Sequence, residues 1–169
     1  MATPELGRIL AVLPVLLACL GPAAAQDEPP EESHDRHVGY YYPVPISREV
    51  YTARSQTIPE AGRGLRIGFV TGISKQMAER PYAPPYAVFA KGTEGEKLII
   101  VALADGPLDT VYRARAVFAD LTAMARLLPI FREFGVQDRF TFFDLAKIMG
   151  FRQITVSDGR SFAHQVMIE

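Results

Sequence analysis

Residues 98–103 read Leu-Ile-Ile-Val-Ala-Leu, an apolar run of strand length that contains no polar side chain. A strand with one face in water alternates apolar and polar residues, so this run indicates a central strand that is covered on both faces. A fold for this chain must therefore supply a layer on each side of that strand. A helix, a tyrosine- and proline-rich segment nearer the amino end, or a partner can supply such a layer.

Two hairpins are predicted from the turn signals. Residues 86–91 and 97–103 are strands joined by a loop with two glycines, Gly92-Thr93-Glu94-Gly95-Glu96. Residues 153–157 and 162–168 are strands joined by the turn sequence Asp158-Gly159-Arg160-Ser161. Strands joined by such short connections pair antiparallel, so the sheet is expected to be antiparallel or mixed.

A further strand is predicted over residues 65–73. Its apolar side would consist of alternate residues, namely Leu65, Ile67, Phe69 and Ile73 with Thr71 among them. Ser74 can cap a short helical turn that reaches about Glu79, and Pro81 prevents its extension.

The longest helix is predicted over residues 109–128, because apolar residues recur there at intervals of three and four. Pro129 ends it, and a short helical piece over 130–134 follows. Thr141 and Asp144 resemble a capping box at the start of a helix over 142–149. The predicted fold class is α+β, a two-layer sandwich in which an antiparallel or mixed sheet of about five strands is backed by two main helices.

The first 25 residues have the order of a cleavable secretory signal. Arg8 precedes an apolar run over residues 9–20, and small residues ending at Ala25 lead to the polar Gln26. The run is shorter than the roughly 20 residues that a membrane-spanning helix needs. We expect cleavage after Ala25 and a mature chain that works in the periplasm or outside the cell, with no transmembrane segment.

Cys19 leaves a second interpretation of this segment. Leu16-Leu17-Ala18-Cys19 resembles the lipobox of bacterial lipoproteins, so a lipid anchor on Cys19 is the alternative. Cys19 is also the single cysteine of the chain, and cleavage after Ala25 would leave no thiol for a disulfide, a nucleophile or a metal site. The folded domain must then be stabilised by packing alone.

Charge is distributed unevenly along the chain. The whole chain has a net charge of −1, which does not suggest a nucleic-acid binder. Residues 26–37 hold five acidic side chains against Arg36 and include Pro29-Pro30, so they are predicted to form a tether. The tether and an extended arm together occupy residues 26–61, and a single α+β domain is predicted over 62–169. His34 and His37 lie in the tether, which lacks the rigidity that a metal site needs, so no metal or cofactor is predicted.

Tyr40, Tyr41 and Tyr42 precede Pro43-Val44-Pro45 in the predicted arm. The prolines favour extended backbone, and the three rings need a surface to lie on. The arm either packs along its own domain or forms a docking strip for a protein partner. Tyr82 and Tyr86 complete the set of candidate binding residues.

His164 is the candidate for chemistry. Its strand face also carries three apolar residues, Phe162, Val166 and Ile168. An enzyme site would use His164 as a base tuned by burial, with Asp158 and Tyr86 beside it. The alternative is a core-edge histidine that is satisfied by a backbone carbonyl. Ser161 lies on the opposite strand face and no Gly-x-Ser-x-Gly motif is present, so a serine hydrolase is not expected.

Several segments of the chain carry a family resemblance, namely Tyr40-Tyr41-Tyr42-Pro43, Arg80-Pro81-Tyr82-Ala83-Pro84, Phe89-Ala90-Lys91-Gly92, Glu96-Lys97-Leu98-Ile99-Ile100-Val101, Phe140-Thr141-Phe142-Phe143-Asp144 and Thr155-Val156-Ser157-Asp158-Gly159. They resemble a family of small exported bacterial proteins without a known function, some of which carry the label molybdopterin-guanine dinucleotide biosynthesis protein A. That label implies a cytoplasmic nucleotidyltransferase. The chain lacks the Gly-Gly-x-Ser-x-Arg-Met-Gly loop of such enzymes, so no site residue carries over.

These observations predict a periplasmic, non-catalytic binding or adaptor protein that contacts a protein partner. An enzyme with a site near His164 is one alternative. A cofactor-handling accessory protein related to the molybdenum cofactor, which the family label implies, is another.

Overall fold

The computed structural model describes residues 42–82, 84–103 and 108–169, which form one mixed five-stranded sheet and four helices. The predicted signal and tether, with Cys19, Tyr40 and Tyr41, lie outside these residues. The strands are β1 (Ser47–Tyr51), β2 (Tyr86–Lys91), β3 (Lys97–Ala102), β4 (Gln153–Ser157) and β5 (Ala163–Ile168). The helices are α1 (Arg63–Ala78), α2 (Val111–Arg126), α3 (Pro129–Glu133) and α4 (Phe142–Ile148). The α+β class with a mixed five-stranded sheet is therefore confirmed.

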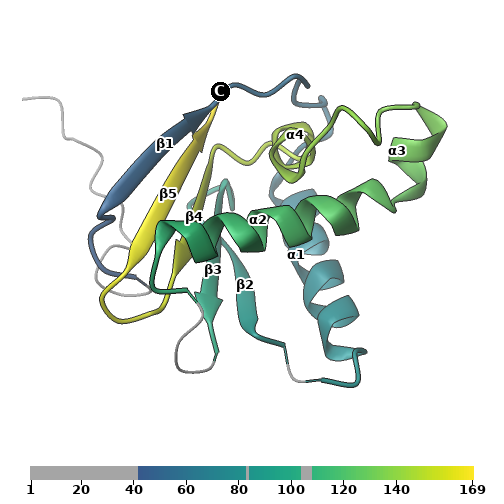
Figure 1. Ribbon diagram of the computed structural model, residues 1–169. Helices are drawn as coiled ribbons and strands as arrows, with labels where there is room; N and C mark the ends of the chain where they lie inside the picture. The colour runs from purple at the N-terminus through teal and green to yellow at the C-terminus, as the bar shows by residue number, and fades with distance from the viewer. Residues whose placement is uncertain (1–41, 83, 104–107) are drawn as a thin grey trace, which may run out of the picture. The chain divides into compact units, whose positions relative to one another are not determined.

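The sheet has the strand order β1-β5-β4-β3-β2 (Figure 1). The two predicted hairpins are present, because β2 pairs antiparallel with β3 and β4 pairs antiparallel with β5. Parallel pairing of β3 with β4 joins the hairpins, so the predicted central strand β3 lies inside the sheet, between β4 and the edge strand β2. β1 pairs parallel with β5 at the sheet edge, and it comes from the segment that the sequence assigned to an extended arm.

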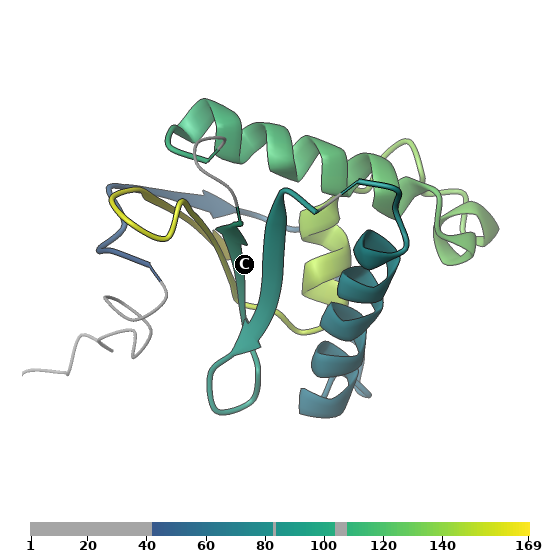
Figure 2. The same ribbon diagram turned by 90° about the horizontal axis from the view of Figure 1, so that it is seen from below.

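The helices lie on one face of the sheet (Figures 1 and 2). Leu98, Ile100, Ile154, Val156 and Val166 point from the strands into this layer and are all buried. They pack in one core with buried residues of the helices, chiefly Val70, Phe118, Leu121 and Phe142. Burial of this apolar surface supplies the main stabilising free energy of the domain.

The opposite face of β3 is covered by the arm rather than by a helix. Tyr42 is 2% exposed and forms a small cluster with the buried side chains of Ile99 and Ala163. Val101 packs against the same cluster. At Tyr42 the chain thus lies on its own sheet, and this contact supplies part of the second layer that residues 98–103 require.

Residues 65–73 form a helix, and the strand predicted there is wrong. They belong to α1, whose buried residues Arg66, Val70 and Met77 recur at intervals of four and seven. Gly64, Gly68 and Gly72 lie on the outer side, where an added Cβ would meet nothing within 4 Å. Glycine weakens a helix and the apolar residues also alternate, so local pattern favoured a strand. Packing of the Arg66 side of α1 against β2 and the core decides the outcome.

α4 begins and ends as its sequence indicates. The buried carboxylate of Asp144 accepts from the backbone N–H of Thr141 at 2.7 Å, which is the return bond of a capping box. At the other end, Gly150 has a φ of 81° and donates to Lys147, while Phe151 donates to Ala146. These two bonds form a Schellman motif, and glycine is needed there because of the left-handed backbone.

Asp144 also ties the end of β1 to α4. Its two oxygens accept from the Arg54 backbone at 2.7 Å and from the Tyr51 hydroxyl at 3.1 Å. Burial raises the pKa of Tyr51, and the neighbouring Asp144 carboxylate adds to that rise while the hydrogen bond with Thr141 opposes it. None of the described helices is long and apolar enough to cross a membrane.

Candidate functional site: an apolar cleft between α1, α2 and α4

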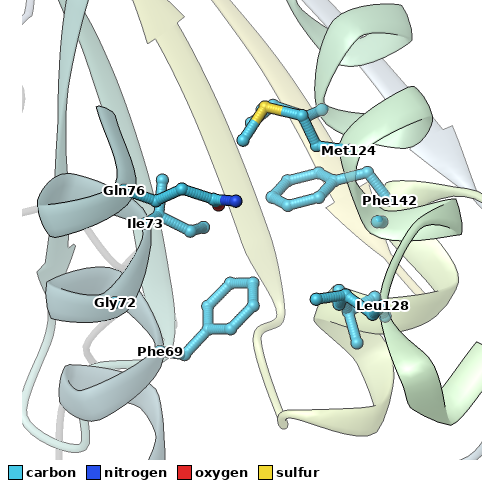
Figure 3. A pocket seen from close by; sticks show the side chains of 10 residues that line it. Phe69, Gly72, Ile73, Gln76, Met124, Leu128 and Phe142 are labelled. Carbon is cyan, nitrogen blue, oxygen red and sulfur yellow. The ribbon is translucent and has the colours of Figure 1, made fainter. Parts of the chain in front are cut away.

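The helical layer contains an open cleft of about 320 Å³. α1 supplies one wall, with Phe69, Ile73 and Gln76, and the facing wall has Met124 of α2 and Leu128, which follows that helix (Figure 3). Phe142 of α4 lies between the two walls. The cleft thus lies between side chains of α1 on one side and side chains of α2 and α4 on the other.

The lining of this cleft is almost wholly apolar. Among the ten residues that line it, Gln76 alone carries a polar side chain, and its amide reaches across the cleft toward the ring of Phe142 (Figure 3). Clefts with apolar walls and one or two placed polar groups are typical ligand or partner sites, with volumes of roughly 300–1,000 Å³. The volume here is at the lower end of that range.

Two exposed leucines are close in sequence to residues that line the cleft. Leu127, which follows α2, is 66% exposed, and Leu65 on α1 is 37% exposed. Gly72 lines the mouth, and an added Cβ there would meet nothing within 4 Å. The mouth is therefore flat on the α1 side, which permits close approach by a partner's backbone.

Arg80 lies at one end of the cleft. Its guanidinium donates to the Met124 sulfur at 3.2 Å, so a cation stands beside an apolar lining residue. Burial raises the pKa of Tyr86, and Asp120 raises it further while Arg80 opposes the change. Tyr86 is thus within electrostatic reach of both Asp120 and Arg80.

The candidate binding tyrosines do not form one surface. Tyr42 is buried on the far face of the sheet, and Tyr86 is 6% exposed within the main core. Tyr82 is 82% exposed in the segment after α1. Among the described candidates, only Tyr82 is therefore available to a partner. The α1 residues of the cleft were not recognisable from the sequence, because the alternation of residues 65–73 predicted a strand.

His164 is completely buried, and the structure places Ser47 and Glu49 beside it. Its Nδ1 lies 3.0 Å from the Ser47 hydroxyl, and its Nε2 lies 3.9 Å from a Glu49 carboxylate oxygen. Nε2 has no hydrogen-bond partner among the described residues. The other oxygen of Glu49 pairs with Arg115 of α2. Desolvation by burial lowers the pKa of His164; Glu49 opposes this change and Arg115 reinforces it.

The other two residues of the predicted enzyme site are elsewhere. The Asp158 carboxylate accepts from the backbone N–H groups of Arg160, Ser161 and Phe162, which fixes the β4–β5 turn. Burial alone would raise the pKa of Asp158, but these backbone hydrogen bonds outweigh it and lower the pKa. Tyr86 lies three strand spacings from His164, on the order of 14 Å away. A site made of His164, Asp158 and Tyr86 is not assembled in this geometry.

A second, polar cleft of about 610 Å³ lies where the β2–β3 loop meets α1 and the end of α4. Arg66, 5% exposed, donates there to the carbonyl of Glu94 at 2.7 and 2.9 Å and to that of Ala61 at 3.1 Å. Its guanidinium is thus used to join three segments of the fold. No group of three or more potential metal-ligating side chains occurs among the described residues.

Comparison of the chain with protein-family models, curated proteins and solved structures finds no match. The resemblance to small exported bacterial proteins therefore stays a prediction, and so does the cofactor-handling role that its label implies.

Proposed function

We propose that this protein is a binding or adaptor protein that receives apolar side chains of a protein partner in the cleft between α1, α2 and α4. The observation that carries the proposal is the apolar lining, which stays open between two 16-residue helices of the domain. Leaving such a surface in water is unfavourable, and large exposed apolar surfaces mark interaction sites.

A protein partner fits the cleft better than a free small molecule does. The volume suits a few side chains of a partner. The exposed Leu65 and Leu127 are near the lining residues Phe69 and Leu128 in sequence but are not part of the lining, so a small ligand held in the cleft would not cover them. Gln76 supplies an amide that can hydrogen-bond a partner's backbone at the edge of the contact. Partner side chains that anchor in such pockets supply most of the binding free energy of an interface.

Closing the cleft mouth tests this function. Gly72→Trp places an indole over the mouth, whereas Gly68→Trp places the same side chain one turn earlier, outside the lining. An added Cβ meets nothing within 4 Å at either position, and tryptophan favours helix more than glycine does, so both variants are expected to fold.

Partner contact is then read by photocrosslinking in the producing cells. A benzophenone amino acid at position 76 is expected to give a discrete protein adduct, which Gly72→Trp reduces at least tenfold and Gly68→Trp leaves intact. Mass spectrometry of the adduct identifies the partner. Equal adducts in the two tryptophan variants, or no protein adduct from position 76, would contradict the proposal.

We also propose that the chain works in the periplasm or outside the cell after loss of residues 1–25. Support comes from Arg8, the apolar run over 9–20 and the small residues before Gln26. Mass measurement of the amino-terminal peptide from producing cells tests this location. A peptide that begins at Gln26 is expected, an acylated Cys19 indicates the lipid-anchored alternative, and intact Met1 on all recovered protein contradicts export.

A further inference from the structure

The contact between Ser47 and His164 joins residues that are 117 positions apart in the chain. Parallel pairing of β1 with β5 sets Ser47 directly opposite His164, and Glu49 follows two positions later on the same face. The register of one strand pair thus brings a hydroxyl, an imidazole and a carboxylate together. This cluster is separate from the apolar cleft, since none of its members lines that cleft.

The position of the imidazole proton follows from the charges around the ring. Desolvation keeps His164 neutral near pH 7, because burial lowers its pKa, so the ring carries one N–H. Nε2 faces the Glu49 carboxylate at 3.9 Å, and an N–H is favoured beside a negative charge. Nδ1 is then the acceptor, and the Ser47 hydroxyl donates to it across 3.0 Å.

This arrangement activates a hydroxyl. A neutral imidazole can take the Ser47 proton, and the imidazolium that forms is stabilised by the carboxylate on its other side. In the common serine–histidine–acid triad the serine contacts Nε2 and the acid contacts Nδ1. Here the serine contacts Nδ1 and the acid lies beside Nε2. Arg115 pairs with the second oxygen of Glu49 and so helps to hold the carboxylate beside the ring.

Ser47 is also within reach of a reactant. It is half-buried on β1, the end strand of the sheet (Figure 1), while His164 beneath it is fully buried. The base is therefore shielded from water, whereas Ser47 as a residue is partly exposed. A nucleophilic serine needs this arrangement, in which the base is buried and the serine can be reached by a reactant.

We propose that Ser47 is a nucleophilic serine that accepts an acyl group from an ester or thioester. The Ser47 Oγ forms a bond to the carbonyl carbon, and the bond from that carbon to the leaving oxygen or sulfur breaks. The proton moves from Ser47 to His164 Nδ1 and then to the leaving group, so that acyl-serine and an alcohol or thiol result. Esters and thioesters are favoured over amides, because their leaving groups need less assistance.

A fluorophosphonate probe on the folded full chain tests this proposal. Its phosphorus forms a bond to the Ser47 oxygen while fluoride leaves, and the proton passes to His164 and then to solvent. Peptide mass spectrometry is expected to find the label on Ser47, and Ser47→Ala removes it. Ser161→Ala is the matched control, because Ser161 is an exposed hydroxyl hydrogen-bonded to Asp158 and should leave labelling unchanged.

Glu49→Gln decides whether the cluster activates the hydroxyl. Its side chain is 37% exposed, so the variant is expected to fold, which circular dichroism checks. Labelling of Ser47 should slow at least tenfold in Glu49→Gln, and the same loss is expected in His164→Gln if that variant folds. Release of p-nitrophenol from p-nitrophenyl acetate, the leaving group of the acylation step, should slow in parallel. An unlabelled Ser47 in folded wild-type chain, or equal labelling in wild type and Glu49→Gln, would overturn the proposal.

Discussion

Asp144 shows how one side chain can organise distant parts of the chain. Its carboxylate is fully buried and accepts from backbone groups at Arg54 and Thr141 and from the Tyr51 hydroxyl. A buried carboxylate is tolerated only where donors replace its lost hydration. The sequence indicated the local half of this arrangement, the cap of α4, whereas the bonds to residues 51 and 54 depend on how β1 enters the sheet.

At His164, burial predicts a pH-dependent stability. Its folded-state pKa is lowered from 6.5, so as the pH falls below about 6.5 the unfolded chain takes up a proton before the folded chain does. The free energy of unfolding should therefore decrease as the pH falls below about 6.5, and level off with respect to this group below its folded pKa. Urea unfolding at several pH values measures this change.

His164→Gln is the control for that measurement. It removes the titrating group while leaving Glu49 and Arg115 in place, so its stability should change less over the same pH window. If the free energy of unfolding changes equally with pH in the variant and the wild type, the buried imidazole is not the source of the pH dependence.

At the scale of elements, α1 is the helix whose local sequence opposes its structure. Gly64, Gly68 and Gly72 are spaced by four and lie where an added Cβ has open space. Each glycine in a helix interior costs about 1 kcal/mol relative to alanine. The helix is nevertheless formed, since Arg66, Val70 and Met77 are buried on its other side.

Gly68→Ala is accordingly expected to stabilise the protein by about 0.5–1 kcal/mol, because alanine restricts the unfolded chain and meets no neighbour in the helix. Thermal and urea unfolding measure the gain. Gly150→Ala is the opposing control, since its Cβ would lie 2.5 Å from an Arg66 nitrogen at a φ of 81° and should destabilise. A loss of stability in Gly68→Ala would show that the outer face of α1 is already in contact with another part of the chain.

At the scale of the molecule, the arm belongs to the fold. β1 pairs with β5, and backbone hydrogen bonds continue this pairing past both ends of β1. The N–H of Ile46 donates to the carbonyl of Ala163 at 3.0 Å, and the N–H of Glu169 donates to the carbonyl of Tyr51 at 3.0 Å. Tyr42 then covers Ile99 on the sheet face away from the helices. The folded unit therefore includes residues that precede the predicted domain start at 62.

Tyr42→Ala tests this view of the arm. Loss of the buried ring should lower the free energy of unfolding by about 3 kcal/mol, in line with aromatic-to-alanine changes in cores. Val44→Ala is the matched control, because Val44 is 67% exposed and should change stability by less than about 0.5 kcal/mol. Equal stability of Tyr42→Ala and the wild type would mean that the arm contributes nothing to the domain.

The local sequence pattern was sufficient to predict β2 to β5, α2 and the caps of α4. Alternation, turn residues and capping side chains act within a few positions of one another, so they can be recognised from the sequence alone. It also indicated that His164 shares a strand face with apolar residues. Three features depended on tertiary structure: the helical state of α1, the entry of β1 into the sheet and the meeting of Ser47 and Glu49 with His164. Each rests on contacts between residues far apart in the chain, and packing free energy at such contacts can exceed a local preference of about 1 kcal/mol per residue.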